Sequence, residues 1–416
     1  MEAEFRLLQK HVFMKIILRL QLIILLLNSC ASEPEIQLGH WRGIINVQGN
    51  EMPFNFRITR QNDTLLAYLK NGNEEILLDE VSVQGDSLIM DMHIFDSDIR
   101  AYLYGDSLSG IWQKKYIDGY QLEFKAYAGD STRFPMIKPT FNFDGKWKVK
   151  FSDEKIDSIY SVGIFNQSSS GALSGTFLNS TGDYRTLEGS VQRDTLLLST
   201  FDGGHAFLFK AYPINDSSLV GEFWSGKSSY ESWTATRDEN AKLQDENRLT
   251  FLKDGYDSIF FTFPDLNGNL VSLSNERFRN KVVILQIFGS WCPNCMDETL
   301  FLSKWYTAEK QENVEILGLS YEVKDDFNYA SGRVRKMKKK LNIPYEFVIA
   351  GTNDKKKAES TLPMLNQILA FPTMIFIDRK GEVRRIHTGF NGPGTGIYHE
   401  QFVLDFTEFM DQLIKE

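Results

Sequence analysis

The sequence predicts a multidomain protein in which two tandem all-β modules, each a small antiparallel barrel or sandwich, precede an α/β domain. Residues 36–236 alternate apolar and polar side chains, with Gly, Asn and Asp turns at short intervals, as antiparallel strands do. From about residue 258, apolar strand-like runs alternate with helix-like segments, which is typical of an α/β domain. A length of 416 residues fits two to three domains.

An internal repeat supports the pair of β-modules. Gly39-His40-Trp41 corresponds to Gly145-Lys146-Trp147, and Arg100-Ala101-Tyr102 corresponds to Lys210-Ala211-Tyr212. Segments 83–88 and 110–112 likewise match 191–196 and 221–223, at an offset that stays between 106 and 111 residues. One module copied twice is therefore predicted, at 36–129 and 140–236, followed by a linker or short connecting helix at 237–257. The opening Gly-x-Trp resembles lipocalin-like barrels. We expect the interior of each barrel to be filled by its own aromatic side chains. The alternative is that the barrel binds a ligand.

Residues 1–30 have the layout of a secretory signal. A basic start at Met14-Lys15 precedes the apolar stretch Ile16–Leu27, which is short for a membrane span. Leu27-Asn28-Ser29-Cys30 resembles a bacterial lipobox, which implies cleavage before Cys30 and attachment of lipid to it. The alternative is a plain N-terminal anchor helix. Acidic residues before Met14 leave the true start open between Met1 and Met14.

Trp291-Cys292-Pro293-Asn294-Cys295 is the segment in which we expect the chemistry. It follows the apolar run Val282–Phe288 and precedes a helix-like stretch, so Cys292 is predicted at a helix N-terminus. Unpaired backbone N–H groups and the helix dipole favour a thiolate there, which makes Cys292 the predicted nucleophile. Cys295 lies one turn later on the same side, within reach of a disulfide, and is the predicted resolving thiol.

Two other uses of this cysteine pair stay open. A zinc site would have to recruit His387 and His399, because the third cysteine of the chain, Cys30, lies far away. A purely structural disulfide is the other.

This region resembles the thioredoxin fold, and more closely the TlpA-like membrane-anchored thiol-disulfide oxidoreductases of bacterial envelopes. The resemblance covers about 258–416 and rests on the pattern Trp-Cys-x-x-Cys-x-x-Glu, which ends at Glu298, and on Phe371-Pro372-Thr373, where the fold carries a cis-proline. It implies a hairpin at 263–273, strands at 281–288, 314–320, 374–377 and 382–388, and helices at 325–341 and 402–413. A strand at 345–350 and a helix at 358–369 match the family's β-α insertion into the thioredoxin-like domain.

The resemblance also implies roles for side chains around the dithiol. Thioredoxins hold a buried acid six residues before the first cysteine, where this chain has Gln286, so Glu298 is the expected carboxylate for proton transfer with Cys295. A solvated helix glutamate is the alternative. Phe371 and Pro372 would shape the substrate groove, Trp291 would cover the sulfur pair or simply pack, and Pro293 and Asn294 would tune the redox potential.

By this resemblance the protein is a thiol-disulfide oxidoreductase, expected to reduce disulfide-containing envelope proteins. It would need no cofactor beyond the redox-active Cys292–Cys295 disulfide, and a membrane electron donor would reduce it again. The lipid on Cys30 would place it in the bacterial cell envelope, periplasmic or associated with the outer membrane. Two alternatives remain. One is a thiol peroxidase of the peroxiredoxin type, although no Thr-x-x-Cys exists. The other is a ligand-binding surface lipoprotein in which the redox domain is auxiliary.

The charge pattern argues against nucleic acid as a partner. The formal net charge is −9, and no basic stripe spans a domain. The exception is a run of six basic residues between Arg333 and Lys340. We interpret it as a solvated helix face, with partner docking as the alternative.

Overall fold

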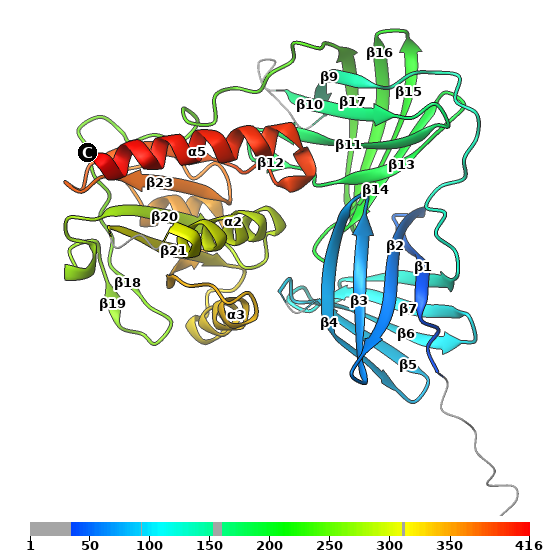
Figure 1. Cartoon of the computed structure of the whole chain (residues 1–416), viewed down its shortest axis with the longest axis horizontal. Helices are drawn as coiled ribbons and strands as arrows, with labels where there is room; N and C mark the ends of the chain where they lie inside the picture. Colours follow the sequence, from blue (N-terminus) through cyan, green and yellow to red (C-terminus); the bar gives the residue numbers. More distant parts are fainter. Residues whose placement is uncertain (1–34, 93, 153–159, 310–312) are drawn as a thin grey trace, which may run out of the picture.

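The computed structural model describes residues 35–92, 94–152, 160–309 and 313–416, and it confirms the predicted fold class. Two β-barrels lie one above the other, and the α/β domain lies beside both of them (Figure 1). The lipobox, Cys30 and the choice between Met1 and Met14 fall outside the described residues. Among the described residues, no helix has the length and apolar character needed to cross a membrane.

Barrel 1 is a closed ring of eight antiparallel strands in sequence order, in which β1 pairs with β8. Its strands are β1 (Gly39–Val47), β2 (Asn50–Gln61), β3 (Thr64–Asn71), β4 (Glu74–Gln84), β5 (Ser87–Met92), β6 (Ser97–Tyr104), β7 (Ser107–Lys114) and β8 (Gln121–Ala128). Inward-facing side chains, including Phe54 and Phe56 with ring centroids 5.8 Å apart, form one buried cluster.

Barrel 2 repeats this plan, with closure between β10 and β11 and a two-residue strand, β12, added outside β11. Its strands are β9 (Gly145–Phe151), β10 (Ser161–Gln167), β11 (Ala172–Asn179), β12 (Gly182–Asp183), β13 (Leu187–Gln192), β14 (Thr195–Phe201), β15 (Ala206–Asn215), β16 (Ser218–Ser225) and β17 (Ser229–Arg237). Phe209 lies in its interior, 4.6 Å from Phe177 and 4.2 Å from Phe223 between ring centroids.

The repeated Gly-x-Trp starts both barrels in the same way. Gly39 and Gly145 adopt φ values of +110° and +104°, which glycine reaches without strain. The indole N–H two residues later donates to the carbonyl four residues before it, at 3.0 Å for Trp41 and 2.8 Å for Trp147. The tryptophan therefore buries its ring and satisfies its one donor in each copy.

Arg133, in the connection between the barrels, fastens them together. Only 4% of its surface is exposed, and it donates to the Asn55 side chain at 3.2 Å in barrel 1 and to the Ser199 carbonyl at 2.8 Å in barrel 2. Phe201 of barrel 2 also packs inside the core of barrel 1, 4.5 Å from Phe54. The two barrels thus share a buried polar and apolar junction.

The α/β domain has a central five-stranded sheet in the order β22-β21-β20-β23-β24. Its strands are β20 (Val282–Phe288), β21 (Val314–Glu322), β22 (Glu346–Thr352), β23 (Thr373–Ile377) and β24 (Val383–Thr388), with a short hairpin of β18 (Phe263–Pro264) and β19 (Leu270–Val271) before them. The strands β20, β21 and β22 run parallel, and β23 is antiparallel to β20. All seven residues of β20 are buried, and all but Gln286 are apolar.

Helices cover both faces of this sheet. On one face pack α2 (Pro293–Glu309), α3 (Phe327–Lys340) and α5 (Ile397–Lys415). The other face is covered by α4 (Lys355–Thr361) and by the chain before β20. Alternate residues of β20 point to the two faces, as Ile284 and Leu285 do. The predicted strands and the helices over 325–341 and 402–413 are confirmed, within a few residues at their ends.

The helix predicted at 358–369 is wrong. The helix begins three residues earlier, because the Asp354 side chain caps it by accepting from the Lys357 backbone N–H at 3.0 Å. It ends at Thr361, two residues before Pro363, which has no N–H to continue a helix. Likewise, residues 238–257, all of which the structure describes, contain no helix and connect the domains as an irregular strap.

Candidate active site

The two cysteines stand where β20 leads into α2. The Cys292 carbonyl accepts the helix bond from the Met296 N–H at 3.1 Å, so Cys292 occupies the start of the helix and Cys295 its first turn. Both are free thiols. Cys292 is 6% exposed and Cys295 is fully buried. The sequence thus brings one slightly accessible and one enclosed sulfur together at a helix N-terminus.

The Cys292 sulfur lies between two backbone groups. It accepts a hydrogen bond from the Cys295 N–H at 3.3 Å, and its thiol donates to the Phe371 carbonyl at 3.3 Å. The bond between Phe371 and Pro372 is cis. The Phe371-Pro372 loop therefore faces the dithiol directly, and an N–H stands ready to stabilise negative charge on the sulfur.

Aromatic side chains lie on the side of the Cys292 sulfur that faces the Phe371-Pro372 loop. The Trp291 indole N–H donates to the Tyr321 carbonyl at 2.9 Å, which fixes the ring. Phe371 packs edge-on against Trp291 at 5.8 Å and lies 5.6 Å from the Tyr321 ring. The bulky Phe371 is therefore part of a three-ring wall.

A buried carboxyl group that sequence reasoning missed holds the loop before the dithiol. Glu322, 1% exposed, accepts from the Ser290 N–H at 2.9 Å and from the Ser290 and Ser320 hydroxyls, each at 2.8 Å. Burial raises its pKa. Its position two residues past the predicted end of its strand gave it the appearance of an ordinary loop acid.

Glu298 lies fully buried one turn after Cys295, so the alternative of a solvated glutamate is wrong. Its Oε2 accepts from the Gln286 side-chain amide at 2.9 Å, and among the described residues no hydrogen-bond partner reaches its Oε1. The Tyr345 hydroxyl donates to the Gln286 carbonyl oxygen at 2.9 Å and so orients the amide. Burial raises the pKa of Glu298 well above its usual value.

Cys295 and Glu298 influence one another through this buried space. Burial is the main cause that raises the pKa of Cys295 well above that of an ordinary thiol, with additions from Cys292 and Glu298. A buried thiol of this kind cannot attack until it loses its proton, and a neighbouring carboxylate is the natural acceptor.

Asn294 and Pro293 face the β-barrels. The Asn294 side-chain amide donates to the Asp183 carbonyl of β12 at 3.1 Å. Pro293 is buried and lies close to Gly204 of barrel 2. No local sequence pattern indicates these contacts between domains.

The basic face of α3 is also in contact with a barrel, so its interpretation as a solvated face is wrong. Arg333 pairs with Asp96 at 3.4 Å, Lys336 with Glu80 at 3.5 Å, and Lys340 with Asp79 at 2.5 Å. These three basic residues dock the α/β domain on an acidic edge of barrel 1, whereas Lys338 pairs with Glu346 of its own domain at 2.8 Å.

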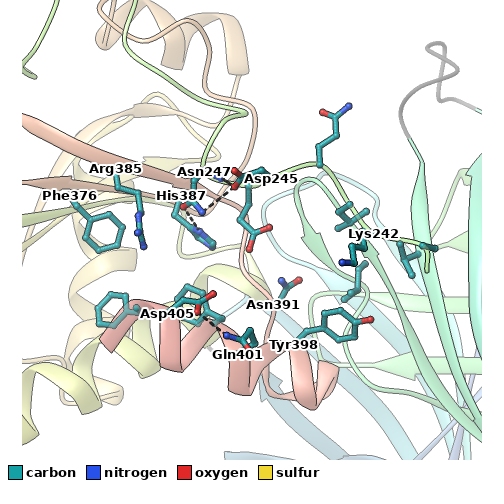
Figure 2. A pocket seen from close by; sticks show the side chains of 18 residues that line it. Lys242, Asp245, Asn247, Phe376, Arg385, His387, Asn391, Tyr398, Gln401 and Asp405 are labelled. Carbon is teal, nitrogen blue, oxygen red and sulfur yellow. Dashed lines mark hydrogen bonds between the residues drawn. The ribbon is translucent and has the colours of Figure 1, made fainter. Parts of the chain in front are cut away.

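A cavity of about 230 Å³ lies away from the dithiol, beneath the strap 238–257. Figure 2 shows Asp245 and Asn247 of the strap above it, His387 and Arg385 beside it, and α5 below. The His387 ring is hydrogen-bonded to the Asn247 side chain at 3.2 Å, and burial lowers the pKa of His387 to about 4. None of the predicted site residues lines this cavity. In the described part of the chain, no three His, Cys, Asp or Glu side chains gather as a metal site would require.

Comparisons with known proteins agree with this site. Residues 257–400 match the Redoxin family model. The thiol-disulfide oxidoreductase ResA of Geobacillus kaustophilus is 29% identical over 129 residues, which cover 31% of this chain and 66% of that protein. The thiol:disulfide interchange protein DsbE of Haemophilus influenzae is 28% identical over 117 residues, 28% of this chain and 56% of that protein.

A solved thiol-disulfide oxidoreductase from Bacteroides fragilis aligns with 35% of this chain and 99% of its own, at 21% identity and a TM-score of 0.28. The matched stretches cover two thirds or less of ResA and DsbE, and the β-barrels lie outside the Redoxin match. The dithiol at the helix start, the facing proline loop and the Redoxin match at 257–400 together identify the α/β domain as a Redoxin domain, similar to those of the TlpA-like thiol-disulfide oxidoreductases.

Proposed function

We propose that this protein exchanges disulfides with proteins of the bacterial envelope through Cys292 and Cys295. One observation carries the proposal. The Cys292 sulfur lies at the start of α2, within 3.3 Å of the Cys295 N–H and of the Phe371 carbonyl beside Pro372. An N–H and a helix N-terminus stabilise a thiolate, and the Phe371-Pro372 loop offers backbone to an extended partner segment.

In the first step the Cys292 thiolate attacks one sulfur of the partner's disulfide. A bond forms between Cys292 and that sulfur, the partner's disulfide breaks, and the second partner sulfur leaves as a thiolate that takes a proton from solvent. Trp291 and Phe371 shield the sulfur during this step, since their rings form the wall beside it.

In the second step Cys295 passes its proton to the Glu298 carboxylate and attacks the Cys292 sulfur. The mixed disulfide breaks as a disulfide forms between the two cysteines, and the partner's remaining sulfur leaves as a thiolate that takes a proton from solvent. The partner is then a dithiol that has gained two electrons. Glu298 accepts this proton because it is buried beside Cys295 with one oxygen free, while Gln286 holds the other. Gln286, Tyr345 and Glu322 are positioning residues in this scheme.

We assign the reductase direction, with a membrane electron donor restoring the dithiol. We also assign a lipid anchor at Cys30 and an envelope location. The lipobox-like Leu27-Asn28-Ser29-Cys30 supports the anchor. The names thiol-disulfide oxidoreductase and thiol:disulfide interchange protein, carried by the matched relatives, support the reaction class.

Reduction of insulin disulfides by the full chain tests the reaction. The unmodified protein accelerates reduction, and both Cys292→Ser and Cys295→Ser abolish turnover, whereas a rate equal to that of buffer alone contradicts the proposal. Equilibration with glutathione tests the direction. A reductase has a potential well below about −200 mV, and a value above about −150 mV assigns the opposite direction.

A further inference from the structure

Residues 179–183, which comprise the end of β11, the turn after it and β12, lie against the redox domain at Asn294, two residues after Cys292. Gly182 abuts the Asn294 side chain, whose amide donates to the Asp183 carbonyl at 3.1 Å. The Asp183 carboxylate accepts from the Gly392 N–H at 2.6 Å. We call residues 179–183 the docked hairpin.

The docked hairpin also contacts Gly389, which lies next to the Phe371-Pro372 loop. A Cβ placed on Gly389 would lie 3.0 Å from the Thr181 carbonyl carbon, so the two backbones touch with no room for a side chain. The Gly389 N–H donates to the Pro372 carbonyl at 2.9 Å. The docked hairpin therefore contacts both flanks of the dithiol, the helix start at Asn294 and the loop tied to Pro372.

Loops of the two barrels cover another side of the dithiol. A Cβ on Gly204 would meet Pro293 at 3.2 Å and the Phe95 ring at 3.4 Å. Ile94 and Phe95 of barrel 1 pack against the same apolar cluster that contains Cys292. The remaining approach to the sulfur runs past Trp291 and Phe371, both partly exposed.

Arg185 holds this arrangement through contacts to all three domains. Its guanidinium pairs with Asp297 of α2 at 2.6 Å, with Glu74 of barrel 1, and with Asp202 of barrel 2 at 3.6 Å. Only 6% of Arg185 is exposed, and Asp202 is 1% exposed. Because Arg185 follows the docked hairpin by two residues, its ion pairs fix the hairpin against the dithiol.

The contacts that Arg185 makes at this junction are of a kind that can open and close reversibly. Four carboxyl groups, those of Glu74, Asp183, Asp202 and Asp297, lie close to one guanidinium, and His205 also pairs with Asp202 at 3.1 Å. A buried ion pair of this kind adds little net stability, and contacts between domains commonly open.

We propose that the docked hairpin is an internal occupant of the partner groove, and that a protein carrying an extended disulfide segment must displace it to reach Cys292. The proposal rests on the proposed function. An extended partner segment bound along Pro372 would occupy the same surface, at Asn294 and Gly389, as the docked hairpin. The two segments therefore cannot be bound at the same time. A small disulfide that enters past Trp291 needs no displacement.

Arg185→Ala tests the closure. Insulin reduction rises at least about tenfold, since a tenfold rise in the open population corresponds to about 1.4 kcal/mol. The rate at which the variant reduces a small aromatic disulfide changes by less than about threefold, which is smaller than this tenfold factor. Arg279→Ala, which removes an exposed arginine paired with Glu276 at 3.0 Å, leaves both rates unchanged. An insulin rate in Arg185→Ala equal to that of the unmodified, folded protein overturns the proposal.

A second measurement avoids any destabilising substitution at the junction. Cys295→Ser is allowed to form a mixed disulfide with insulin, and amide hydrogen exchange is compared before and after. We expect the amides at 179–183 and at Gly392 to exchange at least about tenfold faster in the mixed disulfide. A mixed disulfide with unchanged exchange overturns the docked hairpin and leaves the proposed function intact. Absence of a mixed disulfide in both Cys295→Ser and the double variant with Arg185→Ala overturns the proposed function itself.

Discussion

Gln286 donates a 2.9 Å hydrogen bond to Oε2 of Glu298 beneath the dithiol. In the proposed mechanism, this pair divides between two residues the work of the single buried acid of thioredoxins. The amide on the central strand holds the carboxyl group, and the carboxyl group on α2 is left with one oxygen free beside Cys295. Proton transfer and positioning are therefore separable by mutation.

Glu298→Gln removes the proton acceptor and keeps the shape of the side chain. We expect the second step, release of the partner by Cys295, to slow by roughly 10²-fold, since general acid–base catalysis supplies factors of that order. Formation of the mixed disulfide by Cys292 stays unchanged. Rapid acid quenching followed by mass spectrometry resolves the two steps. Glu276→Gln, on an exposed glutamate, is the control. Equal release rates in Glu298→Gln and the control would remove Glu298 from the mechanism.

Gln286→Leu tests positioning. The Gln286 hydrogen bond lowers the pKa of Glu298, opposing burial, so its loss raises that pKa further. The pH at which partner release reaches half its maximum rate therefore moves upward, together with a loss of about 1–3 kcal/mol of stability from the buried hydrogen bonds that Gln286 makes with Tyr345 and Thr299. A stability loss without any shift of the pH profile shows a purely structural glutamine.

The junction at Arg185 responds to pH through Asp297. Burial, with Glu74 and Asp183 adding to it and Arg185 opposing it, raises the pKa of Asp297 to about 7. A pKa raised by closure means that the closed junction is most stable while Asp297 is protonated, and that this contribution falls as pH rises through about 7. Amide exchange at Asp183 and Gly392, corrected for intrinsic rates, should quicken between pH 5.5 and 8. Asp297→Asn should remove that change, and a pH dependence that survives this substitution assigns it to another group.

Arg133→Met tests the fastening of the two barrels. It removes the buried guanidinium that donates to the Asn71 side chain and to the Ser199 carbonyl, so we expect the barrels to lose about 3–5 kcal/mol in urea unfolding. Arg279→Met, at an exposed ion pair, loses less than about 1 kcal/mol. Equal losses for the two variants would mean that the barrels are held mainly by Phe201 and its apolar neighbours.

Local patterns predicted much of the fold and of the dithiol site. Strand alternation and the Gly-x-Trp repeat indicated two copies of one β-module, and the run Val282–Phe288 before Cys292 indicated a strand leading into a helix. The boundary error at α4 came from a proline, Pro363, whose effect on the preceding helix outweighs the apolar periodicity after it.

Long-range contacts had no local signal. Arg185 lies 111 residues from Glu74 and 112 from Asp297, and nothing in the spacing of these charges shows that the domains bring them together. The resemblance already indicated Glu298 as the carboxylate in place of Gln286, but the hydrogen bond that joins the two side chains links different elements and had no local signal. Such pairings follow from tertiary packing rather than from propensity.

Identification of the sulfur that bonds to a partner tests the central claim most directly. The reduced full chain and its Cys295→Ser variant are mixed with a cystine-containing peptide and analysed by intact mass and peptide mapping. We expect the unmodified chain to lose two hydrogens and carry a Cys292–Cys295 disulfide, and the variant to carry the peptide on Cys292. Peptide found on neither cysteine of the variant, with the unmodified chain still a dithiol, would contradict the account.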